Sequence, residues 1–186
     1  FVYADREGNT MFVHNSLTPK RLPSYDWTQY LPGDDSRLIW QDYMAFDDLP
    51  QVINPTSGYI HSANQTPFRV SAEADNPNKD DYAIEDGFPT RMTNRADRGL
   101  ELLAELESIS EQQFFDIKHD KKYSVNSRAY AYLQQAASAD LSAIQSDNLQ
   151  NYQDAQTLIT NWDLSTDIEN RGAALSACVL GAEWLS

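Results

Sequence analysis

The stretch from residue 58 to residue 67 reads Gly-Tyr-Ile-His-Ser-Ala-Asn-Gln-Thr-Pro, and the rest of the chain is organised around it. Its apolar side chains follow a turn-forming Asn-Pro-Thr-Ser and precede Pro67, which predicts a β-strand over residues 59–64 with a polar end. Asn64 stands at that end, and its carboxamide has two N–H donors that can stabilise a developing negative charge. The alternative is that Asn64 caps the strand or bonds its own backbone. The sequence thus singles out Asn64 as a candidate oxyanion donor.

The composition is that of an acidic globular protein. Among 186 residues, 28 acids outweigh 14 bases, so the formal net charge is −14. This charge repels phosphate backbones and anionic lipids, so nucleic acid is not an expected partner. No apolar run approaches the roughly 18 residues of a membrane span, and none is expected. The single cysteine, Cys178, lies among apolar residues, which predicts a buried thiol rather than a nucleophile.

The residue pattern changes near residue 93. The first half contains a predicted β-hairpin over residues 1–15, with Gly8 in its loop, and the strand at 59–64. The chain starts inside that hairpin, at Phe1, with no leader pattern, so we expect a piece of a longer polypeptide.

From residue 93 onward, apolar residues recur at helical spacing, and Ser110 with Gln113 forms a capping box. Helices are predicted from residues 93 and 110 and over residues 127–143, 148–161 and 171–184. The fold class is therefore α+β: a β-rich segment, 1–92, with a helical segment, 93–186, packed on it.

Two clusters of charge carry candidate chemistry. Residues 68–90 are rich in acids, whose hard oxygens suit calcium, but they lack the spacing of an EF-hand, so a solvated loop and a calcium site both stay open. Arg91, Arg95 and Arg98 precede or open the first helix, where they either form surface salt bridges or orient Asn64 or a substrate carboxylate. His14 and His61 are placed in strands, and motifs for zinc, nucleotides or dinucleotides are absent from the sequence.

Several short motifs, in one order along most of the chain, resemble the penicillin acylase family of N-terminal-nucleophile hydrolases. Each is weak alone, and their shared order carries the resemblance. They are Tyr3-Ala4-Asp5 with Gly8-Asn9, Leu31-Pro32-Gly33-Asp34, Leu49-Pro50, Asn54-Pro55 with Gly58-Tyr59-Ile60, Ala63-Asn64, Arg95 seven residues before Leu102-Leu103, and the turn at Trp162-Asp163.

The resemblance implies a piece of an αββα sandwich in a self-cleaving, two-chain amidase. An N-terminal Ser, with its own α-amine as base, would lie upstream of Phe1, so this chain alone is expected to be inactive. Asn64 matches the family's oxyanion-hole Asn, and Arg95 matches an Arg that supports it. Asp75 is a candidate match for a calcium ligand found in some members, so structural calcium is the one cofactor expected. Gln65 departs from a common second Asn and is expected to tune packing only.

The resemblance also implies a periplasmic or secreted enzyme whose partners are the remaining α- and β-chain segments of the same precursor. Its substrate would be an N-acyl small molecule: a β-lactam side chain, an acyl-homoserine lactone or another acylated amine. Two other readings stay open. The chain could be a non-catalytic binding or assembly domain on an acylase scaffold, or a calcium-dependent acidic module.

Overall fold

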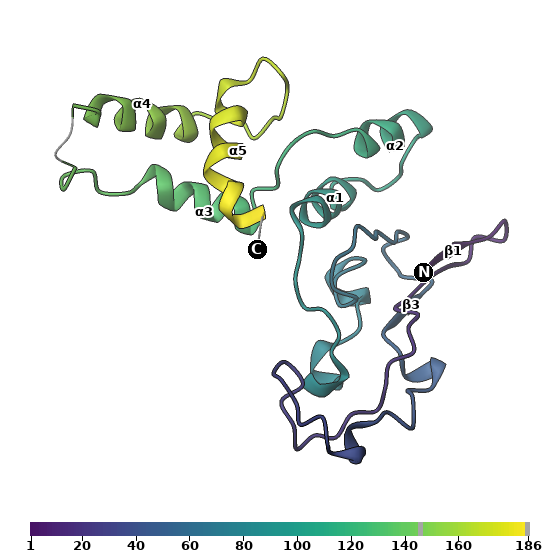
Figure 1. Cartoon of the computed structure of the whole chain (residues 1–186). Helices are drawn as coiled ribbons and strands as arrows, with labels where there is room; N and C mark the ends of the chain where they lie inside the picture. Colours follow the sequence, from purple (N-terminus) through teal and green to yellow (C-terminus); the bar gives the residue numbers. More distant parts are fainter. Residues whose placement is uncertain (145–146, 185–186) are drawn as a thin grey trace. The chain divides into compact units, whose positions relative to one another are not determined.

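The computed structural model describes residues 1–144 and 147–184. It divides into two compact units, residues 1–92 and residues 93–186. All the strands of the described chain lie in the first unit and all its α-helices in the second, so the α+β prediction is confirmed (Figure 1). No helix within the described ranges combines the length and the apolar character needed to cross a membrane.

The first unit contains a small antiparallel sheet in the order β1–β2–β3. Its strands are β1, Val2–Ala4, β2, Thr10–Val13, and β3, Gln51–Ile53. The predicted hairpin is confirmed by the pairing of β1 with β2. Gly8 in its loop has φ +89°, a conformation that glycine adopts without strain. The strand β3 was not predicted from the sequence, and Val52 pairs there with Phe12 of β2.

No strand forms over residues 59–64, so that part of the prediction is wrong. The segment belongs to an irregular stretch, residues 54–76, that contains one short 3-10 helix, Glu73–Asp75. In this stretch the N–H of His61 donates to the carbonyl of Val70 at 2.7 Å. The Gln65 side chain donates a hydrogen bond to the carbonyl of His61, and the Ser71 hydroxyl donates one to the carbonyl of Tyr59. Such local side-chain bonds compete with a strand ladder, and here they replace it.

The irregular stretch is fastened to the sheet by apolar contacts. Phe12, Val52 and Val70 are buried together, and Ile60 packs against them. Each such side chain stabilises the fold by about 1.5–3 kcal/mol when fully buried, which fixes the stretch on the sheet face. A separate set of ring contacts, with centroids 5.3–6.3 Å apart, joins His14, Phe68, Tyr82 and Phe88.

The second unit is helical, as predicted, but the helix predicted over residues 127–143 is shorter than expected and ends at Ala137. Its helices are α1, Asn94–Ala104, α2, Glu111–Lys118, α3, Arg128–Ala137, α4, Leu149–Thr160, and α5, Arg171–Trp184. Hydroxyl side chains of Thr93, Ser110 and Ser127 cap three of them by accepting the N–H three residues ahead. The capping box is confirmed, because the Gln113 side chain also accepts the Ser110 N–H at 2.9 Å.

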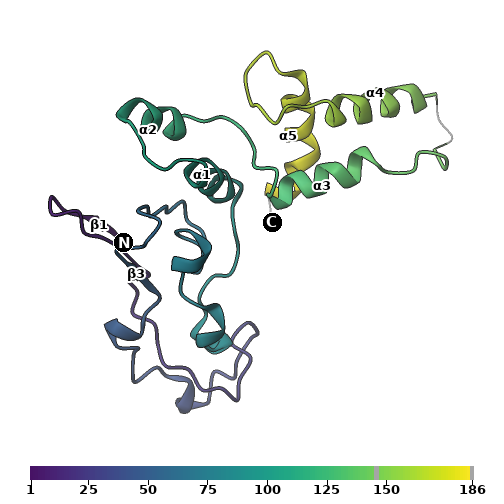
Figure 2. The ribbon, with the colours of Figure 1, turned by 180° about the vertical axis from the view of Figure 1, so that it is seen from behind.

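Three of these helices share one core. Leu133 of α3, Ile159 of α4 and Leu180 of α5 are buried together. Figures 1 and 2 show α3 and α4 running alongside each other, with α5 across the start of α3 and the end of α4. Gly172 permits a close approach of α5, because a Cβ there would come 2.9 Å from Cδ1 of Trp162.

Cys178 is exposed, so the prediction of a buried thiol is wrong. It lies on α5 midway between Ser176 and Leu180, which are both fully buried. Because successive helical residues turn by about 100°, a residue two positions from each of them points away from their face. The apolar neighbours in sequence misled the prediction, because Ala174 and Ala177 are exposed together with Cys178 and only part of the run faces the core.

Candidate functional site

Asn64 lies in the irregular stretch of the first unit, and its side chain is exposed. Its backbone has φ +63°, in the left-handed region. Asn enters this region more readily than most residues other than glycine. The residue is therefore presented on a sharp local bend rather than at the end of a strand.

Side chains hold the backbone around Asn64 in place. The Gln65 carboxamide is buried and accepts the N–H of Ala63, and it donates to the carbonyls of His61 at 2.8 Å and Arg69 at 3.1 Å. The Thr66 N–H donates to the carbonyl of Arg91 at 3.0 Å. The bend that carries Asn64 is thus tied both to its own loop and to the end of the first unit.

The Asn76 carboxamide organises the far side of the stretch. Its oxygen accepts the N–H groups of Val70 and Ser71 at 2.8 and 3.0 Å, and its nitrogen donates to the carbonyls of Ser71 and Ala72 at 3.1 and 2.9 Å. Val70 is also a core residue, so these bonds connect the loop to the sheet. Sequence reasoning missed Gln65 and Asn76 as loop organisers, because their partners are backbone groups that leave no residue-type signal.

Asp75 binds the turn that precedes residue 58. Its carboxylate accepts the N–H and hydroxyl of Thr56 at 2.9 and 2.7 Å and the N–H of Ser57 at 2.9 Å. These hydrogen bonds, that of the Thr56 hydroxyl first, hold the pKa of Asp75 well below its usual range. Asp75 therefore already has hydrogen-bond partners, Thr56 and Ser57, whose turn it stabilises.

Calcium takes about six to eight oxygen ligands, of which Asp75 is expected to supply one. Within residues 1–144 and 147–184, no group of three His, Cys, Asp or Glu side chains is placed to hold a metal ion. The Asp75 carboxylate already accepts three hydrogen bonds. Asp75 as a calcium ligand therefore stays a prediction.

Arg95 is exposed on the first turn of α1, in the second unit, while Asn64 belongs to the first unit. Its support of Asn64 therefore stays a prediction. Arg98 has a different role, because it forms a two-pronged ion pair with Asp120 at 2.9 and 3.0 Å. These hydrogen bonds lower the pKa of Asp120 and raise that of Arg98. For Arg98, the salt-bridge alternative is confirmed.

The three histidines lie in different parts of the fold. His14 follows β2 and packs edge-on against Phe88, with ring centroids 5.3 Å apart, and its burial lowers its pKa. His61 lies in the loop, so its predicted place in a strand is wrong. His119 ends α2, where its ring nitrogen contacts the carbonyl of Phe115 at 2.8 Å.

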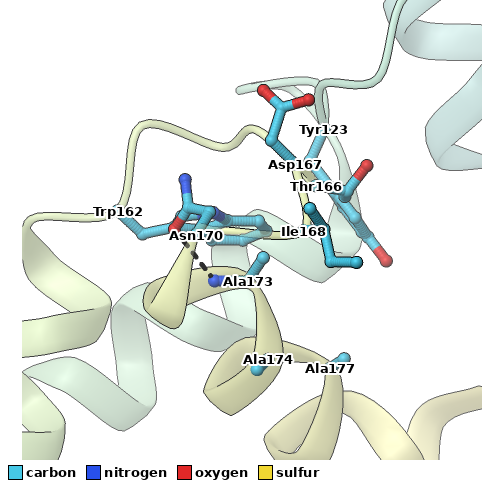
Figure 3. A pocket seen from close by; sticks show the side chains of 9 residues that line it. All are labelled: Tyr123, Trp162, Thr166, Asp167, Ile168, Asn170, Ala173, Ala174 and Ala177. Carbon is cyan, nitrogen blue, oxygen red and sulfur yellow. Dashed lines mark hydrogen bonds between the residues drawn. The ribbon is translucent and has the colours of Figure 1, made fainter.

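A cavity of about 280 Å³ lies in the second unit (Figure 3). Trp162 forms one wall, and its ring centroid lies 5.3 Å from that of Tyr123. Its indole N–H donates to the carbonyl of Ser165 at 2.8 Å. Alanines of α5 line another wall. The Asp167 carboxylate is paired with Lys121 at 3.1 Å. None of the predicted site residues lines this cavity, which belongs to the turn predicted at Trp162-Asp163.

The comparisons with known proteins agree with the motifs. A family model described as penicillin amidase matches residues 1–183. The penicillin G acylase of Escherichia coli is 33% identical over 162 residues, which cover 87% of this chain and 17% of that protein. The chain thus spans about a sixth of the length of this relative. With nearly every residue inside the family match, the chain belongs to the penicillin amidase family.

Proposed function

We propose that this chain is part of a hydrolase that cleaves linear amide bonds in N-acyl compounds, with Asn64 as an oxyanion donor. The observation that carries the proposal is the exposed Asn64 carboxamide on a bend held by buried side chains, in a chain of the penicillin amidase family. A donor that is fixed before the reaction stabilises developing charge without reorganisation. Family membership supports the reaction class, and the position of Asn64 supports its role.

The mechanism needs a nucleophile from elsewhere in the complete protein. We propose an N-terminal Ser, released by self-cleavage, whose own α-amine takes the hydroxyl proton. An α-amine with a pKa near about 8 is a usable base at neutral pH. Attack on the amide carbonyl creates an oxyanion, and the Nδ2–H of Asn64 donates to it. Collapse of this intermediate breaks the C–N bond, the α-ammonium returns its proton to the leaving amine, and the acyl-enzyme that remains is hydrolysed by water.

Arg95, calcium and location complete the proposal. Arg95 would support the oxyanion role of Asn64, as the family resemblance implies. Calcium would be structural, with Asp75 as one ligand and the others supplied by the rest of the protein. The complete enzyme would work in the periplasm or outside the cell, together with the other segments of its precursor.

The test is substitution of Asn64 in the complete, processed protein. Asn64→Gly removes the side chain and tolerates φ +63°, whereas Asn64→Asp keeps the size and removes both donors. We expect both variants to lose at least about 10²–10³ in kcat, the typical cost of one oxyanion donor. Near-normal turnover in Asn64→Gly would reject the assignment.

The controls separate chemistry from folding. Asn15→Ala removes an exposed Asn of the same unit and should leave kcat unchanged. Arg95→Ala should cost less than the Asn64 variants, because Arg95 acts through Asn64, and unchanged kinetics would return Arg95 to a surface-charge role. Intact mass of the complete product should show two chains, the heavier beginning with Ser. A single unprocessed chain with no turnover would favour the non-catalytic binding or assembly domain.

A further inference from the structure

The bend at Asn64 has a feature that its family resemblance does not supply: a buried glutamine directly after the exposed asparagine. Gln65 is 8% exposed, although glutamine is mostly a surface residue. Burial of a carboxamide is costly unless its hydrogen bonds are made. Here one oxygen bond and two nitrogen bonds are made, to residues on both sides of the bend.

The partners fix which way the Gln65 carboxamide faces. The N–H of Ala63 can only donate, so it must meet Oε1. The carbonyls of His61 and Arg69 can only accept, so they must meet Nε2. No other side chain of this length has one acceptor and two donors on its end, so this set of partners is specific to glutamine.

We propose that Gln65 is a positioning residue for Asn64, holding the backbone of residues 61–69 so that the Asn64 carboxamide is aimed before substrate binds. This inference rests on the proposed function of Asn64. The bond to Ala63 fixes the residue before Asn64, and the bonds to His61 and Arg69 close the loop around it. The loop then reaches the core through Val70, whose carbonyl accepts the His61 N–H.

The three hydrogen bonds of Gln65 affect the reaction rate through preorganisation of Asn64. An exposed side chain on an irregular loop would otherwise sample several backbone states, and an oxyanion donor acts best when it needs no rearrangement. A small displacement of a catalytic group costs rate while leaving the ground-state binding of substrate elsewhere intact. Loss of the Gln65 hydrogen bonds should therefore lower kcat and leave KM nearly unchanged.

The experiment uses three Gln65 variants in the complete, processed protein. Gln65→Leu removes all three bonds at similar volume, Gln65→Glu replaces the two donors with an acceptor, and Gln65→Asn keeps the amide but shortens its reach. We expect kcat per folded enzyme to fall about 10- to 100-fold in Gln65→Leu and Gln65→Glu, less in Gln65→Asn, with KM within about twofold. Gln41→Glu, at an exposed glutamine of the same unit, is the matched control and should have no effect.

A double-mutant cycle separates positioning from stability. In the Asn64→Gly background, Gln65→Leu should cost almost nothing further in kcat, because there is no donor left to position. A merely structural Gln65 would lower the melting temperature and leave kcat per folded enzyme unchanged, which would overturn the inference. If Gln65→Leu does not fold, Gln65→Asn gives the same comparison. Wild-type turnover in Asn64→Gly would instead reject the proposed function. If Gln65→Leu lowers kcat as much in the Asn64→Gly background as in wild type, only the coupling between Gln65 and Asn64 is rejected.

Discussion

At the scale of single residues, Asp75 shows how one carboxylate can set a turn. Two backbone N–H groups and one hydroxyl, all from Thr56 and Ser57, point at its two oxygens. These donors favour the ionised form, which is why the pKa of Asp75 lies below its usual range. The turn that they hold leads directly into residues 58–67, so the charge of Asp75 supports the loop that presents Asn64.

Asp75→Asn should therefore destabilise the protein in a pH-dependent way. Because the folded state lowers the pKa of Asp75, its contribution is present above the unfolded pKa, about 3.9, and is lost as the pH falls through the folded value. We expect the variant to have a lower urea midpoint than wild type between about pH 6 and 8. This difference in midpoint should narrow below about pH 4. Asp80→Asn, at an exposed acid nearby, is the control. A gap of equal size at every pH would contradict this role.

The residues of the candidate site differ in how far the sequence could reveal them. Asn64 and Asp75 were singled out by residue type and by family motifs. Gln65 was expected only to tune packing, but its three hydrogen bonds go to backbone groups whose positions exist only after folding. The prediction of a buried Cys178 failed because a run of apolar residues does not show which face of α5 each of them occupies.

At the scale of elements, α1 is held by its polar face. Asn94, Arg98 and Glu101 recur four and three residues apart, so they share one side of the helix. Asn94 accepts the N–H of Ser124 at 2.8 Å, and Glu101 accepts the hydroxyl of this fully buried serine. With the bond of Arg98 to Asp120, the face fixes the segment between α2 and α3.

Arg98→Lys should weaken this attachment, because lysine cannot reproduce the two parallel bonds to Asp120. The two side chains are 24% and 20% exposed, so solvent screens the pair only in part. We expect the free energy of unfolding to fall by about 1–2 kcal/mol, measured with urea at neutral pH. Arg171→Lys, at an exposed arginine that begins α5, should change it by less than about 0.5 kcal/mol. An Arg98→Lys variant as stable as the control would show that the pair contributes nothing measurable.

Elements with strong local signals were predicted well, and the others were not. The five helices followed from apolar spacing and from caps such as Ser110 with Gln113. The strand at 59–64 did not form, because side chains of the loop took the bonds that a ladder would need. The strand β3 was missed, because three residues carry too short a pattern and its pairing partner, β2, lies about forty residues earlier.

At the scale of the whole molecule, many large apolar side chains are exposed, among them Leu17, Tyr30, Ile39, Ile53, Ile84 and Ile168. An apolar side chain that stays in water loses the stabilisation that its burial would bring. These side chains are therefore candidates for a surface that another segment of the protein covers.

The chain spans 17% of its Escherichia coli relative, and in the proposed function the other segments of the same precursor would cover this surface. We expect residues 1–186 expressed alone to bind the dye ANS strongly and to show no hydrolysis of an N-acyl-4-nitroanilide, since the proposed nucleophile lies outside them. Co-expression with the remaining segments should quench the dye signal and restore turnover together, because one interface buries the apolar residues and completes the site. Turnover by the chain alone would place the nucleophile within residues 1–186 and reject the proposal that another segment supplies it. Dye binding that persists in the complete protein would instead assign the apolar surface to another partner.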